Sequence, residues 1–371
     1  MRKLIGLLAA GALASAMPAI ALADEGGPNL TFGASTSFTF DFNDPDDPGA
    51  FPGVPSQNER TYANLESEES FNIDLVQIGV SGTRGPVSYG AKLDLGDLAR
   101  FTGDDDDGDI GLQELFLAID TGFVTVSAGR VPTPIGYESL EPWSIPNISH
   151  SRAWLFQPVN HDGLAVSGEV GNFSGMIGVV NGFAVNDPVG NNVDDEYGII
   201  GNASVVFGDA SLRLSGIYSE ENDEAEFIEL NAVLSGNLDR FRYGLEGTWL
   251  DVDTDDPSAA GPPFPAPEPN SQVWDVTSYF GGSWGGFSAD MRLSYTHEND
   301  TDATREGASA NTGIWSVTAT GGYEITDGVI FRAEYRIDGA SDDVFLDEDA
   351  PNEDIVNIIQ AQLMWTPAIG N

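Results

Sequence analysis

The stretch from Gly129 to Gly163, GRVPTPIGYESLEPWSIPNISHSRAWLFQPVNHDG, decides how the rest of the chain has to be interpreted. It is too long and too rich in proline to be a turn, yet the sequence on both sides alternates like short β-strands. A long connection of this kind is usually either functional or disordered. Its many large apolar residues predict that it is ordered and packed inside something that the strands enclose. These residues are Tyr137, Leu140, Trp143, Ile145, Ile148, Trp154, Leu155 and Phe156.

Apolar and polar residues alternate with a period of two along most of the chain, which is the pattern of half-buried β-strands. About sixteen such stretches can be read, most of them close to the ~9–11 residues that cross an outer membrane as a strand. The predicted strands are 29–42, 70–82, 86–96, 112–120, 123–131, 164–170, 173–183, 197–207, 210–219, 225–236, 240–252, 272–284, 287–297, 313–325, 329–339 and 354–366.

The connections between these stretches are alternately long and short. Residues 83–85 and 171–172 are short connections, whereas 97–111 and 132–163 are long ones. Bacterial outer-membrane barrels have short turns on the periplasmic side and long loops on the outside. The alternation therefore predicts an all-β fold, a transmembrane antiparallel up-and-down β-barrel with the long third loop folded into its lumen. One such barrel domain is expected to span residues 24–371.

The two faces of the predicted strands favour a membrane barrel over a soluble one. In the stretch 329–339, one face carries valine, phenylalanine, alanine, tyrosine and isoleucine, and the other carries Arg332, Glu334, Arg336 and Asp338. Charged side chains are costly in a dry protein core but are natural on a water-filled lumen. The apolar face is therefore expected to point outward to lipid.

The N-terminal residues 1–23 are typical of a secretory signal peptide. Arg2 and Lys3 precede a short apolar run, which ends in Ala21-Leu22-Ala23, a small-residue cleavage site. An uncleaved N-terminal anchor is the alternative, but the run is short for a spanning helix. The chain has no cysteine, so it has neither a disulfide nor a thiolate metal site. Export and a membrane barrel together predict a Gram-negative outer-membrane location.

The charge balance is strongly acidic, with 15 basic against 59 acidic residues and a formal net charge of −44. A polyanion such as nucleic acid is excluded as a partner, because it needs a basic footprint. The acids gather on the long connections, where they either keep the loops soluble or bind Ca²⁺ or Mg²⁺ bridging to anionic lipid. Residues 103–114 partly match an EF-hand loop but lack its first ligand. The candidate Ca²⁺ ligands are Asp104, Asp105, Asp107 and Asp109.

Against this background, the chain resembles the OmpL-like β-barrel porin family. The resemblance rests on AGRVPTPIGYE at 128–138, EPW at 141–143, PNIS at 146–149 and VVNG at 179–182. It implies passive diffusion of small hydrophilic solutes across the outer membrane, without cofactor or catalysis. Outer-membrane lipid and lipopolysaccharide are then the surrounding partners, and analogy with porins suggests a homotrimer. The chain departs from many such barrels in continuing for six residues beyond Trp365.

Within that resemblance, the third loop is where porins narrow their pore. The expected constriction residues are Tyr137, Glu138, Glu141, Trp143, Asn147, His150, Arg152 and His161. The expected lumen wall carries the basic residues Lys92, Arg213, Arg242, Arg292, Arg332 and Arg336. The acids of the loop would either face these bases across the pore, giving a transverse field, or each base would simply neutralise a neighbouring acid. Acids at the mouth outnumber the bases, so weak cation preference is expected.

Two other functions use the same barrel. Ser149-His150-Ser151 invites comparison with an outer-membrane phospholipase, in which a serine nucleophile is activated by a base. The stretch lacks a distinctive nucleophile motif, and polar residues on a pore loop explain it more simply. A calcium-dependent surface or structural barrel with a plugged lumen is the other alternative. Conduction across a bilayer distinguishes a channel from both.

Overall fold

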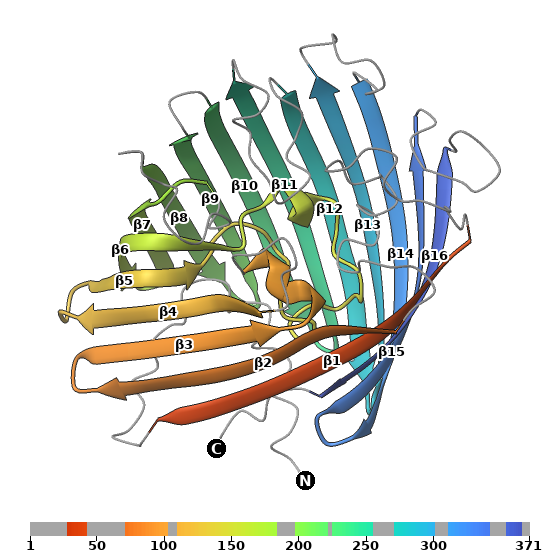
Figure 1. Ribbon diagram of the computed structural model, residues 1–371, viewed down its shortest axis with the longest axis horizontal. Coiled ribbons are helices and arrows are strands. Elements are labelled where there is room, and N and C mark those ends of the chain that lie inside the picture. Colours follow the sequence, from red (N-terminus) through yellow and green to blue (C-terminus); the bar gives the residue numbers. More distant parts are fainter. Residues whose placement is uncertain are drawn as a thin grey trace.

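The computed structural model describes residues 28–42, 71–102, 110–183, 197–221, 225–254, 271–300, 311–341 and 354–365. Sixteen antiparallel strands form one closed barrel in which each strand pairs with its neighbours in sequence and β1 pairs with β16 (Figure 1). The prediction of an all-β antiparallel barrel of this size is therefore confirmed. The strands are β1 Asn29–Asp41, β2 Phe71–Arg84, β3 Val87–Leu95, β4 Ile110–Asp120, β5 Thr125–Pro132, β6 Asn160–Val170, β7 Phe173–Val180, β8 Gly198–Phe207, β9 Ala210–Glu221, β10 Ala225–Leu238, β11 Phe241–Thr254, β12 Ser271–Trp284, β13 Phe287–Asp300, β14 Asn311–Thr326, β15 Val329–Ala340 and β16 Ile355–Trp365.

The predicted signal peptide and the four candidate Ca²⁺ ligands lie outside the described residues. Two short 3₁₀ helices accompany the strands, η2 at Asp97–Phe101 and η3 at Ala153–Phe156. No helix in the described part of the chain is long and apolar enough to cross a membrane.

Tight turns join the strands at one end of the barrel. Most have two residues and place a glycine at positive φ, as at Gly85, Gly171, Gly208 and Gly285. Two-residue hairpins need positive φ to match the twist of the strands, and only glycine adopts it freely. Asp239, with φ 57°, takes the same role between β10 and β11. These turns set the pairing register of successive hairpins around the barrel.

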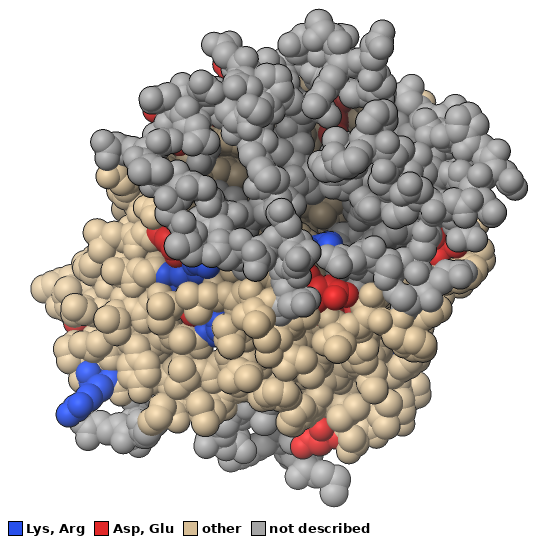
Figure 2. Space-filling view, in the orientation of Figure 1, with Lys and Arg blue, Asp and Glu red and all other residues tan. Residues whose placement is uncertain are grey.

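Side chains alternate between an apolar outer face and a polar inner face. On β15, Phe331 and Tyr335 are exposed, whereas Arg332, Glu334 and Arg336 are at most 3 % exposed. In a closed barrel the buried face is the inner one, and the exposed face is the outer surface. On the face seen in Figure 2, most of the described surface carries no charge. This is the arrangement of a membrane barrel.

The wall differs in height around the barrel. Strands β5 and β7 have 8 residues each, whereas β12 and β13 have 14 and β14 has 16. The low side lies next to the segment that joins β5 to β6. That segment is shorter than predicted, because β6 begins at Asn160 rather than at residue 164 and Pro132 pairs with Asn160. We call residues Thr133–Val159 the connecting segment.

Candidate functional site

The connecting segment leaves and returns at the same point of the wall. The Thr133 amide donates to the Val159 carbonyl at 3.0 Å, directly beyond the paired Pro132 and Asn160. Between these ends the chain has no strand and a single 3₁₀ turn, η3, yet most of its side chains are buried. Backbone groups without a ladder have to find other partners when they are buried. In this segment they find them on the inner faces of the strands.

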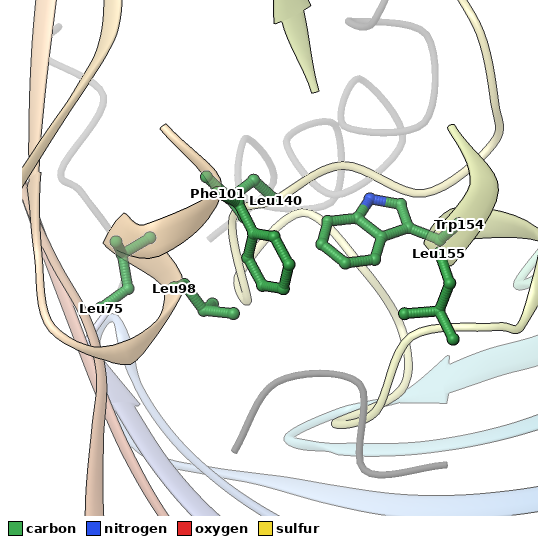
Figure 3. Packing of buried hydrophobic residues seen from close by; sticks show 6 residues of the cluster. All are labelled: Leu75, Leu98, Phe101, Leu140, Trp154 and Leu155. Atoms are coloured by element: carbon green, nitrogen blue, oxygen red, sulfur yellow. The ribbon is translucent and has the colours of Figure 1, made fainter. Parts of the chain in front are cut away.

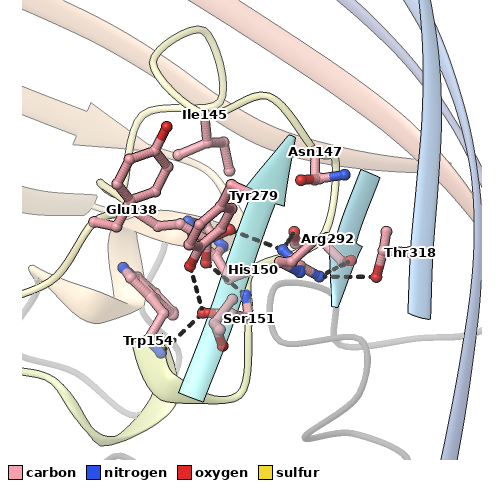
Figure 4. A network of polar contacts seen from close by, with 12 residues as sticks. Glu138, Ile145, Asn147, His150, Ser151, Trp154, Tyr279, Arg292 and Thr318 are labelled. Atoms are coloured by element: carbon pink, nitrogen blue, oxygen red, sulfur yellow. Dashed lines mark hydrogen bonds and ion pairs between the residues drawn. The ribbon is translucent and has the colours of Figure 1, made fainter. Parts of the chain in front are cut away.

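The central contact is an ion pair between the segment and β13. Glu138 Oε1 lies 2.8 Å from Arg292 Nη1, and the two side chains are 1 % and 0 % exposed (Figure 4). Arg292 also donates to the Ser149 carbonyl and, at 3.3 Å, to the Thr318 hydroxyl of β14. The other Glu138 oxygen accepts from the Ser151 amide. One arginine therefore joins two parts of the segment to two neighbouring strands.

Glu334 of β15 holds the next part of the segment through backbone amides. Its carboxylate accepts from the Ile148 amide at 2.6 Å and from the Ser149 amide at 3.0 Å. The hydroxyl of Thr320 on β14 donates to the same carboxylate and accepts from the side chain of Asn147. Hydrogen bonds to an ionised carboxylate are about twice as strong as neutral ones. Glu334 therefore fixes this turn of the segment against β14 and β15.

Two arginines of β15 bind carbonyl groups of the segment. Arg332 donates to the Ile145 carbonyl at 2.7 Å and to the Pro142 carbonyl at 3.0 Å. Arg336 donates to the His150 carbonyl at 2.8 Å while forming two hydrogen bonds with Asp338. The inward bases of this wall therefore act on the backbone of the segment as well as on its acids.

A second ion pair holds the segment at β3 and β4. Lys92 Nζ of β3 lies 3.0 Å from Glu141 Oε1 and 2.6 Å from Glu114 of β4. Gln113 of β4 donates to the same Glu141 oxygen. The Trp143 ring lies against β1 so closely that a Cβ on Gly33 would be 2.6 Å from it. The contacts of the segment thus end on β1, β3 and β4 as well as on β13 to β15.

Strands β9 to β12 contact the beginning of the segment. The Gly136 amide donates to Asn231 of β10, and its carbonyl accepts from Arg213 of β9. The Tyr137 amide donates to Glu246 of β11 at 3.0 Å. The Tyr137 ring stacks on Tyr279 of β12 with their centroids 4.1 Å apart.

Apolar clusters fill the space between these polar contacts. In the first, Leu140, Trp154 and Leu155 of the segment pack against Leu75 of β2 and against η2 (Figure 3). The Phe101 ring of η2 meets Trp154 edge-on at 4.9 Å. Three of the large apolar residues of the segment, Leu140, Trp154 and Leu155, therefore pack against β2 and η2.

Three further expected site residues, Arg152, His161 and Arg242, contact the barrel wall or the start of the segment. Arg152 lies 3.9 Å from both Glu298 and Asp338, and it is 0 % exposed. His161 belongs to β6, not to the segment, and its Nε2 lies 3.1 Å from the Thr133 hydroxyl. Arg242 pairs with Asp290 of β13. Among the described residues, no group of three or more histidine, cysteine, aspartate or glutamate side chains could hold a metal ion.

Burial and charge set the ionisation of the segment. Burial raises the pKa of Glu138 and of Glu141, but Arg292 and Lys92 outweigh it, so both pKa values lie below the usual range. Burial lowers the pKa of His150 from 6.5 to about 4. At neutral pH the segment therefore carries two carboxylates and an uncharged imidazole, whose ring stacks on Trp154 at 3.9 Å.

Several residues that hold the segment are not among the expected constriction and lumen-wall residues. Glu334, Glu246 and Tyr279 are inward residues that bind the segment, and Ile135 is a buried segment residue at 1 % exposure. Glu334 and Glu246 had a usable signal, because each lies on the polar face of its predicted strand, Glu334 between Arg332 and Arg336 and Glu246 with Arg242. Tyr279 had no such signal in the sequence, and a strand pattern does not identify the partner of any of the three across the barrel.

The tight-turn end of the barrel contains a cavity of about 420 Å³ along β4 to β8. Register pairs place Ala118, Ser127 and Ala165 on the inner face, and Ala118 and Ser127 line this cavity. Asp120 and Glu169 line it nearer the turns. This cavity is large enough for a small solute.

The family comparison covers nearly the whole chain. The sequence model of the family described as beta-barrel porin-2, OmpL-like, matches residues 30–366. No curated protein sequence matches this chain.

Solved structures with the same fold are outer-membrane proteins. The Salmonella typhi OmpF complex with daunomycin is 10 % identical, with a TM-score of 0.61 over 91 % of this chain and 97 % of the other. An anion-selective porin from Comamonas acidovorans is 9 % identical, with a TM-score of 0.58 over 92 % and 99 %. The trimer form of Vibrio cholerae OmpT is 11 % identical, with a TM-score of 0.57 over 92 % and 99 %. At such identities the likeness establishes the fold alone.

Proposed function

This chain belongs to the OmpL-like β-barrel porin-2 family of the Gram-negative outer membrane, and from that premise we propose that it lets small hydrophilic solutes and ions diffuse passively through its barrel. The family and the closed sixteen-strand barrel make it an outer-membrane channel protein. The proposal adds a weak preference for cations and the absence of catalysis.

The observation that carries the proposal is the set of contacts made by the connecting segment. Its partners include Lys92 of β3 and Arg292, Glu334 and Arg336 across the closed barrel. A chain that binds inner faces on both sides narrows the space between them. We therefore take the segment as the long loop folded into the lumen. The segment that forms the constriction carries Tyr137, Glu138, Glu141, Trp143, Asn147, His150 and Arg152, with His161 beside it on β6.

Most of the basic residues of the lumen wall bind the connecting segment, and the deeply buried ones cannot line an open passage. Arg292 and Arg336 are at most 1 % exposed and bind the segment directly. A charge that is buried and paired exerts little net field on a passing ion. The alternative in which each base neutralises a neighbouring acid therefore fits better than a transverse field. The net charge of −44 then favours cations through the whole-protein potential.

Membrane partners and oligomeric state follow from the proposed location. The exposed apolar faces of the strands suit outer-membrane lipid, and the acidic long connections suit lipopolysaccharide bridged by divalent cations. We propose a homotrimer, because Vibrio cholerae OmpT, which shares the fold, is described in a trimer form.

A plugged structural barrel is the second candidate, and dense packing favours it. The segment and its partners leave Glu138, Ser151, Arg292 and Thr318 at 4 % exposure or less. A phospholipase is less well supported, because the surroundings of Ser151 are those of a structural residue. Its hydroxyl accepts from the Trp154 amide and from Tyr279, and the His150 Nε2 bonds to the Ser139 carbonyl.

Planar-bilayer recording with purified protein tests the proposal. Discrete conductance steps, with a reversal potential in a salt gradient that indicates mild cation preference, are the expected result. Protein that inserts in folded form but never conducts would leave the plugged barrel as the function. Release of fatty acid from phospholipid vesicles, abolished by Ser151→Ala, would instead favour the hydrolase.

A further inference from the structure

The connecting segment is held unevenly around the barrel. Towards β3 and β13 to β15 it is bound by ion pairs and charge-assisted hydrogen bonds. Towards β6 to β9 it has two polar contacts, of the Thr133 hydroxyl with His161 and of the Gly136 carbonyl with Arg213, and the side chain of Ile135 lies between them in the sequence. Ile135 packs in an apolar cluster with Ala165, Met176, Val180, Ile200 and Ile217.

Movement of the Ile135 side chain would leave the polar contacts of the segment intact. The backbone beside it is fixed, since the Gly136 amide donates to Asn231 and the Gly136 carbonyl accepts from Arg213. The Ile135 side chain itself has only apolar neighbours in its cluster. A change in the size of this one side chain therefore alters the packing between the segment and the β6 to β9 wall while the backbone contacts stay in place.

The 420 Å³ cavity lies on the same side of the barrel. Met176 lines it and also belongs to the Ile135 cluster. A second, much smaller cavity shares Val131, Pro132 and Met176 with the first and reaches Pro134 of the segment. Ile135 lines neither cavity, but it packs against Met176, which lines both, and so lies next to the open space at the tight-turn end.

The described lining of the large cavity carries negative charge. Asp120 and Glu169 contribute carboxylates near the turns, and Asn202 contributes an amide. None of the described residues that line the cavity is lysine or arginine. Carboxylates in a narrow space with low-dielectric walls raise the local concentration of cations.

We infer that solutes cross the level of the connecting segment on the β4 to β8 side, past an apolar barrier formed by Ile135, and that Asp120 and Glu169 favour small cations at the tight-turn end of that passage. This inference rests on the proposed channel function and names the path within it. The paired Glu138 and Arg292 then position the segment without lining the passage. Apolar constrictions resist ion flow when water leaves them, so the size of residue 135 controls conductance.

Single-channel conductance of Ile135→Ala and Ile135→Trp tests the barrier. The smaller side chain should raise conductance about two-fold or more and the larger should reduce it, as expected for an apolar constriction. Ile145→Ala is the matched control, because Ile145 is a buried isoleucine of the same segment whose carbonyl is held by Arg332 of β15. An increase in the control as large as in Ile135→Ala would overturn the path.

Reversal potentials in a salt gradient test the cavity acids. The double variant Asp120→Asn, Glu169→Gln should show a measurably lower cation preference than the wild type, and both sites are exposed, so the protein should still fold. Asp239→Asn removes an exposed acid from another tight turn, outside the cavity lining, and should leave the preference unchanged. An unaltered reversal potential in the double variant would contradict the inference. A wild type that never conducts would instead refute the proposed channel function.

Discussion

At the scale of residues, we expect the largest loss of stability when the buried ion pair of Glu138 and Arg292 is broken. Arg292→Met leaves the Glu138 carboxylate buried without its partner, and breaking a buried pair from one side costs about 3–5 kcal/mol. The midpoint of thermal unfolding in detergent should therefore fall clearly. Arg240→Met, at a half-exposed arginine of a tight turn, is the control and should have little effect.

The double variant Arg292→Met, Glu138→Gln separates the pair from simple loss of packing. It should recover part of the lost stability, because no unpaired charge then stays buried. A double variant that is as unstable as the sum of the two single variants would show that the charges are independent.

His150 predicts how stability depends on pH. Its folded pKa of about 4 lies below the ordinary 6.5, because burial disfavours the charged ring, so the folded protein binds fewer protons than the unfolded one. The stability from this group is complete above pH 6.5 and is lost as the pH falls towards 4. His150→Phe keeps a ring beside Trp154 and removes the titration. Its melting temperature should fall less between pH 7 and pH 4 than that of the wild type; equal falls would mean that His150 does not contribute.

The direction of the site residues could be predicted from the sequence, but their contact partners could not. The inward direction of Arg292, Arg332 and Arg336 could be predicted, since side chains in a strand alternate strictly. Their partners could not, because the connecting segment has no periodicity from which a contact across the barrel could be inferred. The position of Ile135 against β6 to β9 depends on how the segment bends. That bend is set by bonds to Asn231 and Arg213, far away in sequence.

At the scale of the strands, period-two alternation and the alternation of short and long connections were enough to predict the barrel. The boundaries were less accurate where the strands meet the segment. Residues 160–163, with the sequence Asn-His-Asp-Gly, have little strand propensity, yet they belong to β6 because β5 supplies pairing partners up to Pro132. Helix η2 was missed within a long connection, although Leu98 and Phe101 gave an apolar signal there.

The outward direction of β4 gives a test of the membrane orientation. Leu117 is 60 % exposed on the outer face, so Leu117→Arg places a charge in lipid and should cost about 2–4 kcal/mol near the bilayer midplane. The yield of folded protein in lipid vesicles, measured against urea, should fall accordingly. Leu117→Met keeps the site apolar and should fold like the wild type. Equal urea midpoints for the arginine and methionine variants would place β4 outside the hydrocarbon layer.

At the scale of the whole molecule, the excess of acidic residues favours the binding of divalent cations. We propose that Asp104, Asp105, Asp107 and Asp109, which lie outside the described residues, bind Ca²⁺ together with other acids of the long connections. An ion that binds only the folded state stabilises it by mass action, so chelation at constant ionic strength should lower the melting temperature. Changing these four aspartates to asparagine should abolish the response to chelator. A melting temperature that does not respond to chelator in the wild type would leave these acids a role in solubility alone.

Whether the connecting segment narrows a conducting lumen is tested most directly by removing it and recording single channels. Pro132 and Asn160 are already paired, so an Asn-Gly turn can replace residues 133–159 without disturbing the hairpin of β5 and β6. The wild type should conduct in small steps, and the shortened protein should conduct in steps several-fold larger with weaker ion preference. Equal conductance in the two proteins, with both shown to be folded, would contradict a channel narrowed by this segment.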